Sequence, residues 1–371
     1  MDTQQRLYEI ALTFIPQIGD KNARALFNHF GSAKEILAAT QKALLGIEGL
    51  GPARAKSILE AAKNGALLQR AEAELAFAQK HGIRILTQQD SDYPARLRTC
   101  EDAPFLLYVK GEAKLNADRL VAVIGTRKPS DYGVQLTEAL VSGLQAAGVT
   151  IVSGLAHGVD AVAHRQSLTS GLPTVGVLAH GLDRMYPDKN RQLARDMVQQ
   201  GGALVTEFPH GTALHPDFFP VRNRIVAGMC DATVIVESDV KGGSMITAYL
   251  AHGYNREVAA FPGRVGDLRA AGCNLLIRRT VAALITNADD LLDTMGWNVQ
   301  KGKKAVQNKL LLTFSEEEQK VVNALSQKEK VHSDDLLLIS GIGASQLAAT
   351  LLQLEMNGVV RSLPGKNYRL A

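Results

Sequence analysis

Several features that define common protein classes are missing from this sequence. Its three cysteines, Cys100, Cys230 and Cys273, lie far apart and match no zinc-ligand spacing. Its nine histidines form no HExxH pattern. We therefore predict neither a metal site nor a cofactor, and we interpret the cysteines as buried or incidental thiols.

Long apolar runs are missing as well. No stretch of 18 apolar residues occurs, so a transmembrane helix is not expected. The first ten residues, MDTQQRLYEI, lack the basic and then apolar order of a signal peptide. The sequence thus predicts a cytoplasmic protein without a membrane partner.

Strong charge is also absent, because the formal net charge is only +4. Such a charge permits an anionic partner but does not demand one. With 46% hydrophobic and 21% charged residues, the chain has the composition of a globular protein. Its length of 371 residues favours two or three domains.

The distribution of apolar residues predicts three regions and a linker. Residues 1–75 show helical spacing throughout, punctuated by Gly and Pro. Residues 76–297 alternate short β-branched runs with helical stretches, which predicts a parallel sheet wrapped by helices. The expected strands are Ile83–Leu86, Leu120–Ile124, Val149–Val152, Thr174–Leu178, Ala203–Thr206, Thr233–Val236, Val258–Phe261 and Ala283–Ile285. Residues 298–310 are polar and rich in lysine, as in a solvated linker, and residues 311–371 form the last region.

The N-terminal region contains a helix-hairpin-helix pattern at IEGLGPARAKSIL, with a weaker copy at FIPQIGDKNARALF. Glycines in such a turn let backbone amides approach a phosphate at a helix N-terminus. Residues 1–94 carry eleven Lys/Arg against ten Asp/Glu, which makes no basic patch. DNA contact and a purely structural scaffold both remain open for this module.

The C-terminal region resembles a winged helix. Leu336–Gly358 has a helix-turn-helix pattern with Gly341 in the turn, and GVVRSLPGKNYRL follows as strand, turn and strand. From Glu316 to Ala371 there are six Lys/Arg and seven Asp/Glu. Because a DNA reader carries a basic face, we favour a protein-interaction or structural role over DNA reading.

Two loops of the central region are candidates for phosphate binding. The predicted strand Leu120–Ile124 ends in IGTRKPSDYG, which is not GxGxxG but places Arg127 and Lys128 at the strand's carboxyl end. The predicted strand Val149–Val152 ends in VSGLAHGVDAVAH, where Ser153, Gly154, His157 and Gly158 lie in a small-residue loop suited to an anion. Asp160 is expected to cap the following helix.

Two further segments extend this set. FFPVRNRIVAGM places Phe219, Arg222, Asn223 and Arg224 at what we interpret as a strand end. Arginines beside aromatic rings fit phosphate contact and base stacking, although arginine also forms structural ion pairs. KGGSMITA resembles an anion cradle but lacks the GxxxxGK[ST] pattern of ATP-binding loops. Its candidate residues are Lys241, Gly242, Gly243, Ser244 and Thr247. Four strand ends would thus bring small or basic residues to one edge of the sheet.

These motifs occur in an order that resembles the DNA-processing protein A (DprA/Smf) family. The segments are VAVIGTR, IVSGLAHGVDAVAH, GLDRMYP, FFPVRNRIVAGM, GGSMITA, AAFPG and AGCNLLI, preceded by DYPARLR and PFLLYVKG. The resemblance implies an extended Rossmann fold, single-stranded DNA binding and a homodimer. It also implies protection of incoming DNA and its transfer to the RecA recombinase in natural transformation.

The resemblance also assigns residues. Arg127 matches a DNA-contacting arginine, and Arg222 and Arg224 match an Arg-Asn-Arg pair. His157 stands where relatives often carry Lys or Arg, so it supplies less charge near neutral pH. Asn274, Leu275, Leu276 and Ile277 match a dimer-forming region, with an ordinary buried helix as an equal alternative.

Two rival functions are considered. A related Rossmann core occurs in lysine-decarboxylase-like nucleoside monophosphate phosphoribohydrolases, whose PGGxGTxxE motif supplies a catalytic Glu. Here KGGSMITAYL places Leu250 near that spacing, and we predict no enzymatic activity. The other rival is a DNA-repair scaffold that acts only through its end modules.

Overall fold

The structure, a computed structural model, describes residues 3–297, 314–326, 331–357, 359–363 and 367–370. Two units separate within the chain, Met1–Val299 and Gln300–Ala371, and each is described by itself. The predicted linker, residues 298–310, lies outside the described residues.

Within residues 3–297, the strands form one nine-stranded sheet in the order β1-β2-β6-β5-β4-β3-β7-β8-β9. The strands from β6 to β9 along this order are parallel, whereas β1 and β2 are antiparallel to their neighbours. The strands are β1 (Ile83–Thr87), β2 (Leu106–Gly111), β3 (Leu120–Ile124), β4 (Thr150–Ser153), β5 (Thr174–Val177), β6 (Ala203–Thr206), β7 (Ala232–Ile235), β8 (Glu257–Ala260) and β9 (Ala283–Leu284). The predicted α/β fold with an extended Rossmann-like core is confirmed.

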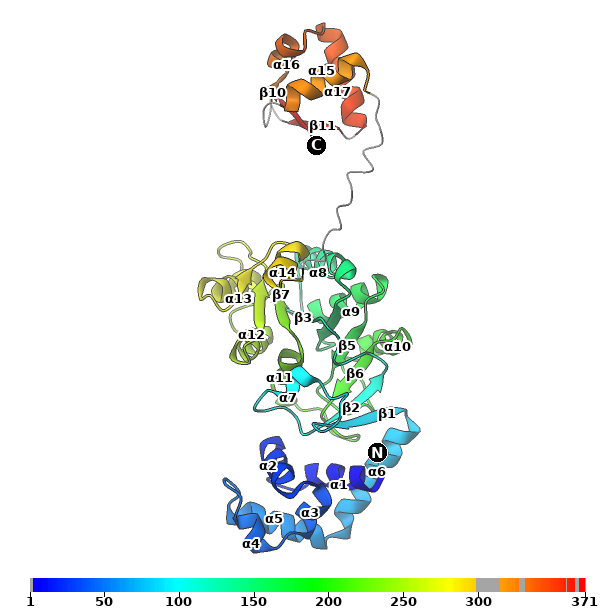
Figure 1. Cartoon of the computed structure of the whole chain (residues 1–371), viewed down its shortest axis with the longest axis vertical. Helices are drawn as coiled ribbons and strands as arrows, with labels where there is room; N and C mark the ends of the chain where they lie inside the picture. The colour runs from blue at the N-terminus through cyan, green and yellow to red at the C-terminus, as the bar shows by residue number, and fades with distance from the viewer. Residues whose placement is uncertain (1–2, 298–313, 327–330, 358, 364–366, 371) are drawn as a thin grey trace. The chain divides into compact units, whose positions relative to one another are not determined.

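Helices cover both faces of this sheet (Figure 1). They are α7 (Ala95–Arg98), α8 (Asp131–Gly143), α9 (Val159–Thr169), α10 (Arg191–Gln199), α11 (Phe218–Met229), α12 (Gly243–Gly253), α13 (Leu268–Arg278) and α14 (Ala288–Thr294), with short 3₁₀ turns at Gln145–Ala147 and Asp188–Asn190. Strand β3 shows why both faces are covered. Leu120, Ala122 and Ile124 pack with α11, α12 and α13 in one core, whereas Val121 and Val123 pack with α8, α9 and α14 in another. All five side chains are buried, as expected of a central parallel strand.

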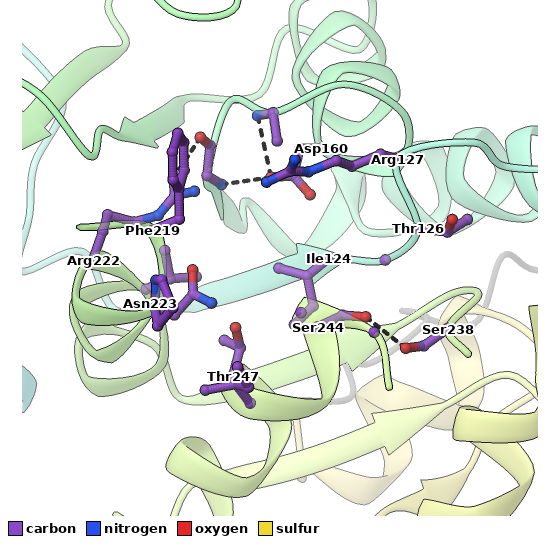
Figure 2. Close-up of a pocket in the computed structure, with 18 of the residues that line it drawn as sticks. Ile124, Thr126, Arg127, Asp160, Phe219, Arg222, Asn223, Ser238, Ser244 and Thr247 are labelled. Atoms are coloured by element: carbon purple, nitrogen blue, oxygen red, sulfur yellow. Dashed lines mark hydrogen bonds between the residues drawn. The ribbon is translucent and has the colours of Figure 1, made fainter. Parts of the chain in front are cut away.

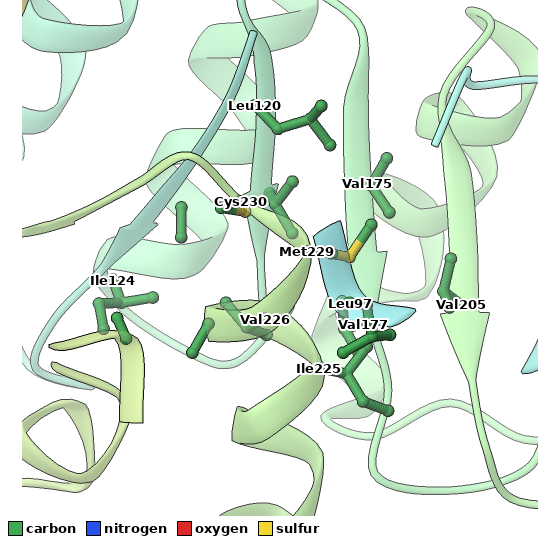
Figure 3. Packing of buried hydrophobic residues seen from close by; sticks show 14 of the residues in the cluster. Leu97, Leu120, Ile124, Val175, Val177, Val205, Ile225, Val226, Met229 and Cys230 are labelled. Atoms are coloured by element: carbon green, nitrogen blue, oxygen red, sulfur yellow. The ribbon is translucent and has the colours of Figure 1, made fainter. Parts of the chain in front are cut away.

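The first of these cores shows how α11 is fixed against the sheet (Figure 3). Ile225, Val226 and Met229 on one side of α11 are buried against strands β3 to β6. This packing determines which residues of α11 face the edge of the sheet.

The strand order places a crevice between β3 and β7. Strands β3 to β6 follow one another outward on one side, and the chain then returns to add β7 on the other side of β3. Ligands of open α/β sheets bind beyond the carboxyl ends of the strands at such a reversal. The loops after β3 and β7 are therefore the expected place for a site.

The N-terminal helices pack around a separate apolar cluster. They are α1 (Thr3–Thr13), α2 (Asp20–Phe30), α3 (Ala33–Ala38), α4 (Gln41–Leu45), α5 (Pro52–Lys63) and α6 (Gly65–Lys80). Helix α6 continues to Lys80, beyond the predicted end of the helical region at residue 75, because its apolar spacing persists through the buried Ala78. The hairpin pattern is confirmed: Gly49 has a positive φ of 79°, and Ala55 and Ile58 are fully buried.

The second unit has the predicted winged-helix arrangement. Its elements are α15 (Glu316–Ser326), β10 (Val331–His332), α16 (Ser333–Ser340), α17 (Ala344–Met356), β11 (Val360–Leu363) and β12 (Asn367–Leu370), with the strands ordered β10-β12-β11. Gly341 ends α16 with a φ of 67°, the left-handed conformation that glycine adopts without strain. Among the described residues, no single helix is long and apolar enough to cross a membrane; α16 and α17 reach that length and composition only as a pair bent by 108°.

Candidate nucleic-acid interface

A pocket of about 650 Å³ opens at the crevice between β3 and β7 (Figure 2). It is bounded by the loops after β3, β4 and β7 and by the first turns of α11 and α12. Nine of the predicted site residues line it: Arg127, Gly154, Phe219, Arg222, Asn223, Gly242, Gly243, Ser244 and Thr247. The topology thus brings together segments that are more than a hundred residues apart in the sequence.

Arg127 is the exposed cation of this pocket. Its guanidinium carbon lies 5.6 Å from the centre of the Phe219 ring. No carboxylate of the described residues lies within 4.0 Å of its side chain. The ring centre of Tyr186 lies 5.7 Å from that of Phe219 in an edge-on arrangement, and both residues line the pocket. A cation beside two aromatic rings can contact a phosphate while a base stacks next to it.

The N-terminus of α12 forms another wall. Gly242 is its N-cap residue and provides no side chain to cap the first backbone amides. Ser244 donates from its hydroxyl to that of Ser238 at 2.7 Å, which fixes the turn after β7. Because the first amides of a helix carry partial positive charge, this wall suits an anion.

The loop between β4 and α9 differs from the prediction. Asp160 was expected to cap α9, but it lies inside the helix and accepts hydrogen bonds from the amides of Gly154 (3.1 Å) and Ala156 (3.3 Å). Burial raises the pKa of Asp160 above its ordinary value, while the charge of Arg222 lowers it. These two amides are therefore already bonded within the protein, which removes them from the predicted anion-binding loop.

Arg222 lies beneath this loop rather than at a strand end. The segment Phe218–Met229 is helix α11, because its apolar residues at helical spacing pack against the sheet. The Arg222 side chain donates to the carbonyl oxygens of Gly154, at 2.5 Å, and of Val177, and the residue is 5% exposed. Burial lowers the pKa of this guanidinium to about 10. Arg222 thus forms the floor of the pocket and holds the β4–α9 loop in place.

Arg224 faces away from the pocket and is not among its lining residues. It forms ion pairs with Glu207 and, at 3.1 Å, with Asp20 of helix α2. It also donates to the carbonyl oxygen of Asp102 at 2.6 Å. The structure therefore shows Arg224 joining the N-terminal helices to the core.

Comparison with known proteins gives a consistent result. The family model for DNA recombination-mediator protein A matches residues 84–296. The chain belongs to the DprA family. Models of the DprA winged helix domain and of a SAM-like helix-hairpin-helix tandem match residues 309–366 and 9–64. The predicted family resemblance is thereby confirmed.

Relatives of known name include the putative DNA processing protein DprA of Mycobacterium tuberculosis, which is 34% identical over 81% of this chain and 80% of its own length. Protein Smf of Escherichia coli is 30% identical over 81% of this chain and 80% of its own length. Among solved structures, DprA from Streptococcus pneumoniae covers 79% of this chain and 98% of its own at 28% identity, with a TM-score of 0.65. The structure of DprA from Helicobacter pylori, described for its single-stranded DNA binding mode, covers 57% of this chain and 95% of the Helicobacter protein at 31% identity, with a TM-score of 0.52.

The remaining predicted residues of this DprA-family chain lie around the pocket. Ser153 is fully buried and donates to the carbonyl oxygen of Val123 at 2.7 Å, which makes it a structural residue. Gly158 has a φ of +79°, and a Cβ there would lie 2.2 Å from the carbonyl oxygen of Thr126, so only glycine fits. His157 is exposed and lines a small adjoining cavity. Lys128 and Lys241 are exposed outside the pocket lining.

The predicted dimer residues lie on α13. Leu276 is fully buried in the core of the chain itself, so it offers no surface to a second copy. Leu275 and Ile277 are partly buried against the same core. Asn274 exchanges two hydrogen bonds with the backbone of Gly263, at 3.0 and 3.1 Å. The prediction of a dimer surface therefore rests on Leu275 and Ile277.

Sequence reasoning missed several residues that line the pocket, among them Tyr186 and Ser238. Tyr186 is the tyrosine of the motif GLDRMYP, which was noted only for its family resemblance, although an aromatic residue in the loop after β5 could have suggested a stacking role. Ser238 lies three residues after the end of β7 and carried no sequence signal, because its place depends on the hydrogen bond from Ser244.

Proposed function

We propose that this DprA-family protein binds single-stranded DNA through the pocket between β3 and β7. The observation that supports the proposal most is the position of Arg127, exposed beside the Phe219 ring and across the pocket from the N-terminus of α12. The proposed groups have separate tasks. Arg127 and the amides of α12 contact phosphates, whereas Phe219 and Tyr186 stack on a base.

The same pocket favours a single strand over a duplex. Stacking on Phe219 requires a base that is not already paired and stacked in a double helix. A single strand can turn its bases into a pocket at little cost. The related Helicobacter pylori DprA is described for single-stranded DNA binding, which agrees with this choice.

The wider role follows the family. We propose that the protein acts without catalysis in the cytoplasm, as a homodimer that protects incoming DNA and loads RecA onto it during natural transformation. The phosphoribohydrolase alternative is less favoured, because Leu250 on α12 stands near the place of the catalytic Glu. In addition, the Glu237 carboxylate accepts a hydrogen bond from the amide of Ser130, the N-cap of α8, and so occupies the helix N-terminus where Rossmann enzymes bind a phosphate.

Binding to labelled 20-nucleotide single strands and to the matching blunt duplex tests the proposal, measured by fluorescence anisotropy across a salt series. We expect tighter binding to the single strand and a steep loss of affinity with salt, because bound phosphates release counterions. Equal affinity for the duplex at moderate salt would contradict it. A second measurement, RecA assembly on the same strand with and without the protein, tests the loading role.

A further inference from the structure

A second cavity, of about 760 Å³, lies beside the proposed DNA pocket. It opens at the carboxyl ends of β7 and β8, next to the first turn of α8. Its apolar side includes Phe261, which is buried, and Tyr132, which is 59% exposed at the surface. The polar groups that line it include Glu237, Arg264 and Asp267. An exposed aromatic ring over a buried apolar wall suits a flat, partly polar ligand.

The two cavities share their walls. The β3–α8 loop lines the DNA pocket with Gly125, Thr126 and Arg127 and lines the second cavity with Ser130. Likewise, the segment after β7 contributes Ser238 to the first and Glu237 to the second. A strand leaving the DNA pocket therefore has to cross only this wall to reach the second cavity. The exposed Lys128 lies on the same loop, between the residues that face each cavity.

At Glu237, the second cavity disfavours phosphate and favours hydrogen-bond donors. Glu237 is 7% exposed and accepts from the amide of Ser130 at 2.9 Å and from the Ser130 hydroxyl. Among the described residues, no cationic side chain lies within 4.0 Å of its carboxylate. A carboxylate in this position repels an anion and accepts from an N–H group, as it does from the exocyclic amine of cytosine.

We propose that the cavity lined by Tyr132, Glu237 and Arg264 is a second nucleotide subsite, which takes an amino-bearing base of the same single strand. Tyr132 stacks on the base, and Glu237 accepts from its exocyclic amino group. Arg264, at the exposed edge, contacts the adjoining phosphate, and Lys128 contacts the phosphate that crosses the shared wall. Thymine lacks the amino group and fits this subsite less well. The proposal rests on DNA binding in the first pocket.

Anisotropy titrations of the full chain with labelled dC20 and dT20 test this subsite. Because stacking on an aromatic ring is worth about 1–3 kcal/mol per base, Tyr132→Ala should weaken dC20 binding about fivefold or more. Tyr132→Phe keeps the ring and should bind as the wild type does. Arg264→Ala removes the proposed phosphate contact and should weaken binding. Its matched control is Arg195→Ala, which removes an exposed arginine of α10 outside both cavities and should leave the affinity for dC20 unchanged. Glu237→Gln should reduce the affinity for dC20 more than that for dT20.

The outcomes separate the two proposals. If the wild type binds neither oligonucleotide, DNA binding itself fails and the subsite fails with it. If binding depends on Arg127 but Tyr132→Ala and Arg264→Ala match Arg195→Ala, the first pocket stands and the second subsite is wrong. If Tyr132→Phe and Tyr132→Ala lose the same affinity for dC20, the stacking role is also wrong, because only the hydroxyl group would then contribute to binding.

Discussion

Arg127 is exposed beside Phe219, whereas the guanidinium groups of Arg222 and Arg224 are enclosed by protein. A buried guanidinium needs protein groups that compensate its charge and accept its hydrogen bonds, because water no longer does so. Arg222 donates to two backbone carbonyls and interacts with the charge of Asp160, whereas Arg224 pairs with two carboxylates. Of these three residues, only Arg127 combines a free approach from solvent with an aromatic neighbour.

Arg127→Ala should weaken single-stranded DNA binding by about 1–3 kcal/mol, the usual scale for hydrogen bonds to charged groups. Arg127→Lys should restore part of the loss, because an ammonium cannot bind a phosphate through two parallel hydrogen bonds. The melting temperature should stay near that of the wild type, since the side chain has no carboxylate partner among the described residues. A destabilised Ala variant with unchanged affinity would remove Arg127 from the site.

His164 gives a prediction about pH. It is fully buried, and its Nδ1 lies 2.7 Å from the hydroxyl of Thr174, which itself donates to the carbonyl oxygen of Ile151. Burial, with the charges of Arg222 and Arg165, lowers the pKa of His164 to about 3. The unfolded chain takes up this proton below about pH 6.5, whereas the folded protein does not, so stability falls as the pH falls.

Between pH 6.5 and pH 5 this group should remove about 2 kcal/mol from the free energy of unfolding. His164→Asn keeps a donor toward Thr174 and has no titrating group, so its stability should decline less over that interval. His252→Asn, a change at an exposed position of α12, is the control and should follow the wild type. Urea unfolding at both pH values measures the difference. If the free energy of unfolding falls by the same amount between the two pH values in His164→Asn and in the wild type, His164 is not the group responsible.

At the scale of elements, helix α13 shows how one segment carries two kinds of residue. Leu276 points into the core, whereas Leu275 and Ile277 are only partly covered. Strand β9 lies next to β8 at the edge of the sheet and exposes Leu284 by 51%. These partly covered apolar residues form the surface that we propose for contact with a second copy.

Two variants of α13 should therefore behave differently. Leu276→Ala removes buried volume and should cost about 2–5 kcal/mol of stability while leaving the dimer intact. Ile277→Arg places a charge on the proposed contact surface and should give a stable monomer. Light scattering and thermal unfolding on both proteins distinguish the effects. A wild type that is monomeric at tens of micromolar, about the scale of weak association, contradicts the dimer.

Helix α17 is the other element with a functional implication. It contains no lysine or arginine, and its exposed residues include Leu352 and Met356, at 60% and 77% exposure. Helix α17 is the second helix of the helix-turn-helix. In winged-helix proteins that read DNA, this helix enters the major groove and needs polar or basic side chains. The structure therefore supports the preference for a protein-interaction or structural role of this unit.

At the scale of the whole molecule, the proposed DNA pocket lies entirely within the first unit, Met1–Val299. Deleting residues 300–371 should thus leave the affinity for a 20-nucleotide single strand within about twofold of the wild type. Anisotropy titration of the truncated and full chains measures this. A large loss would favour the rival scaffold function, in which the end modules carry the DNA contact.

The N-terminal helices differ, because they are tied to the core by buried charge. Arg6 pairs with Asp90 at 3.0 Å, and Arg224 joins Asp20 to the edge of the sheet. The buried Glu74 of α6 accepts hydrogen bonds from the backbone amide and the imidazole of His210. Removing one partner from such a pair leaves an uncompensated buried charge, so these helices are a structural part of the first unit whatever they bind.

The sequence alone determined much of this protein. Alternating β-branched runs and helical stretches predicted the parallel sheet, and the order of the motifs indicated the DprA family. Nine of the predicted site residues meet in one pocket, because the loops after β3, β4 and β7 lie on the same edge of the sheet and the first turns of α11 and α12 adjoin them. Local sequence patterns, together with the general rules for how strands and helices connect, suffice to predict these features, because the features depend on residues that are close in the sequence.

Only the tertiary structure decided which of those residues are free to bind. Arg222 and Arg224 flank Asn223 in their motif and carry the same guanidinium group as Arg127, yet the packing of α11 encloses both. Asp160 takes the amides that the loop sequence seemed to offer to an anion, and Leu276 is turned into the core. Whether each of these side chains is free to bind depends on its burial and on partners that lie far away in the sequence. The spacing of residues in the sequence predicts neither of these directly.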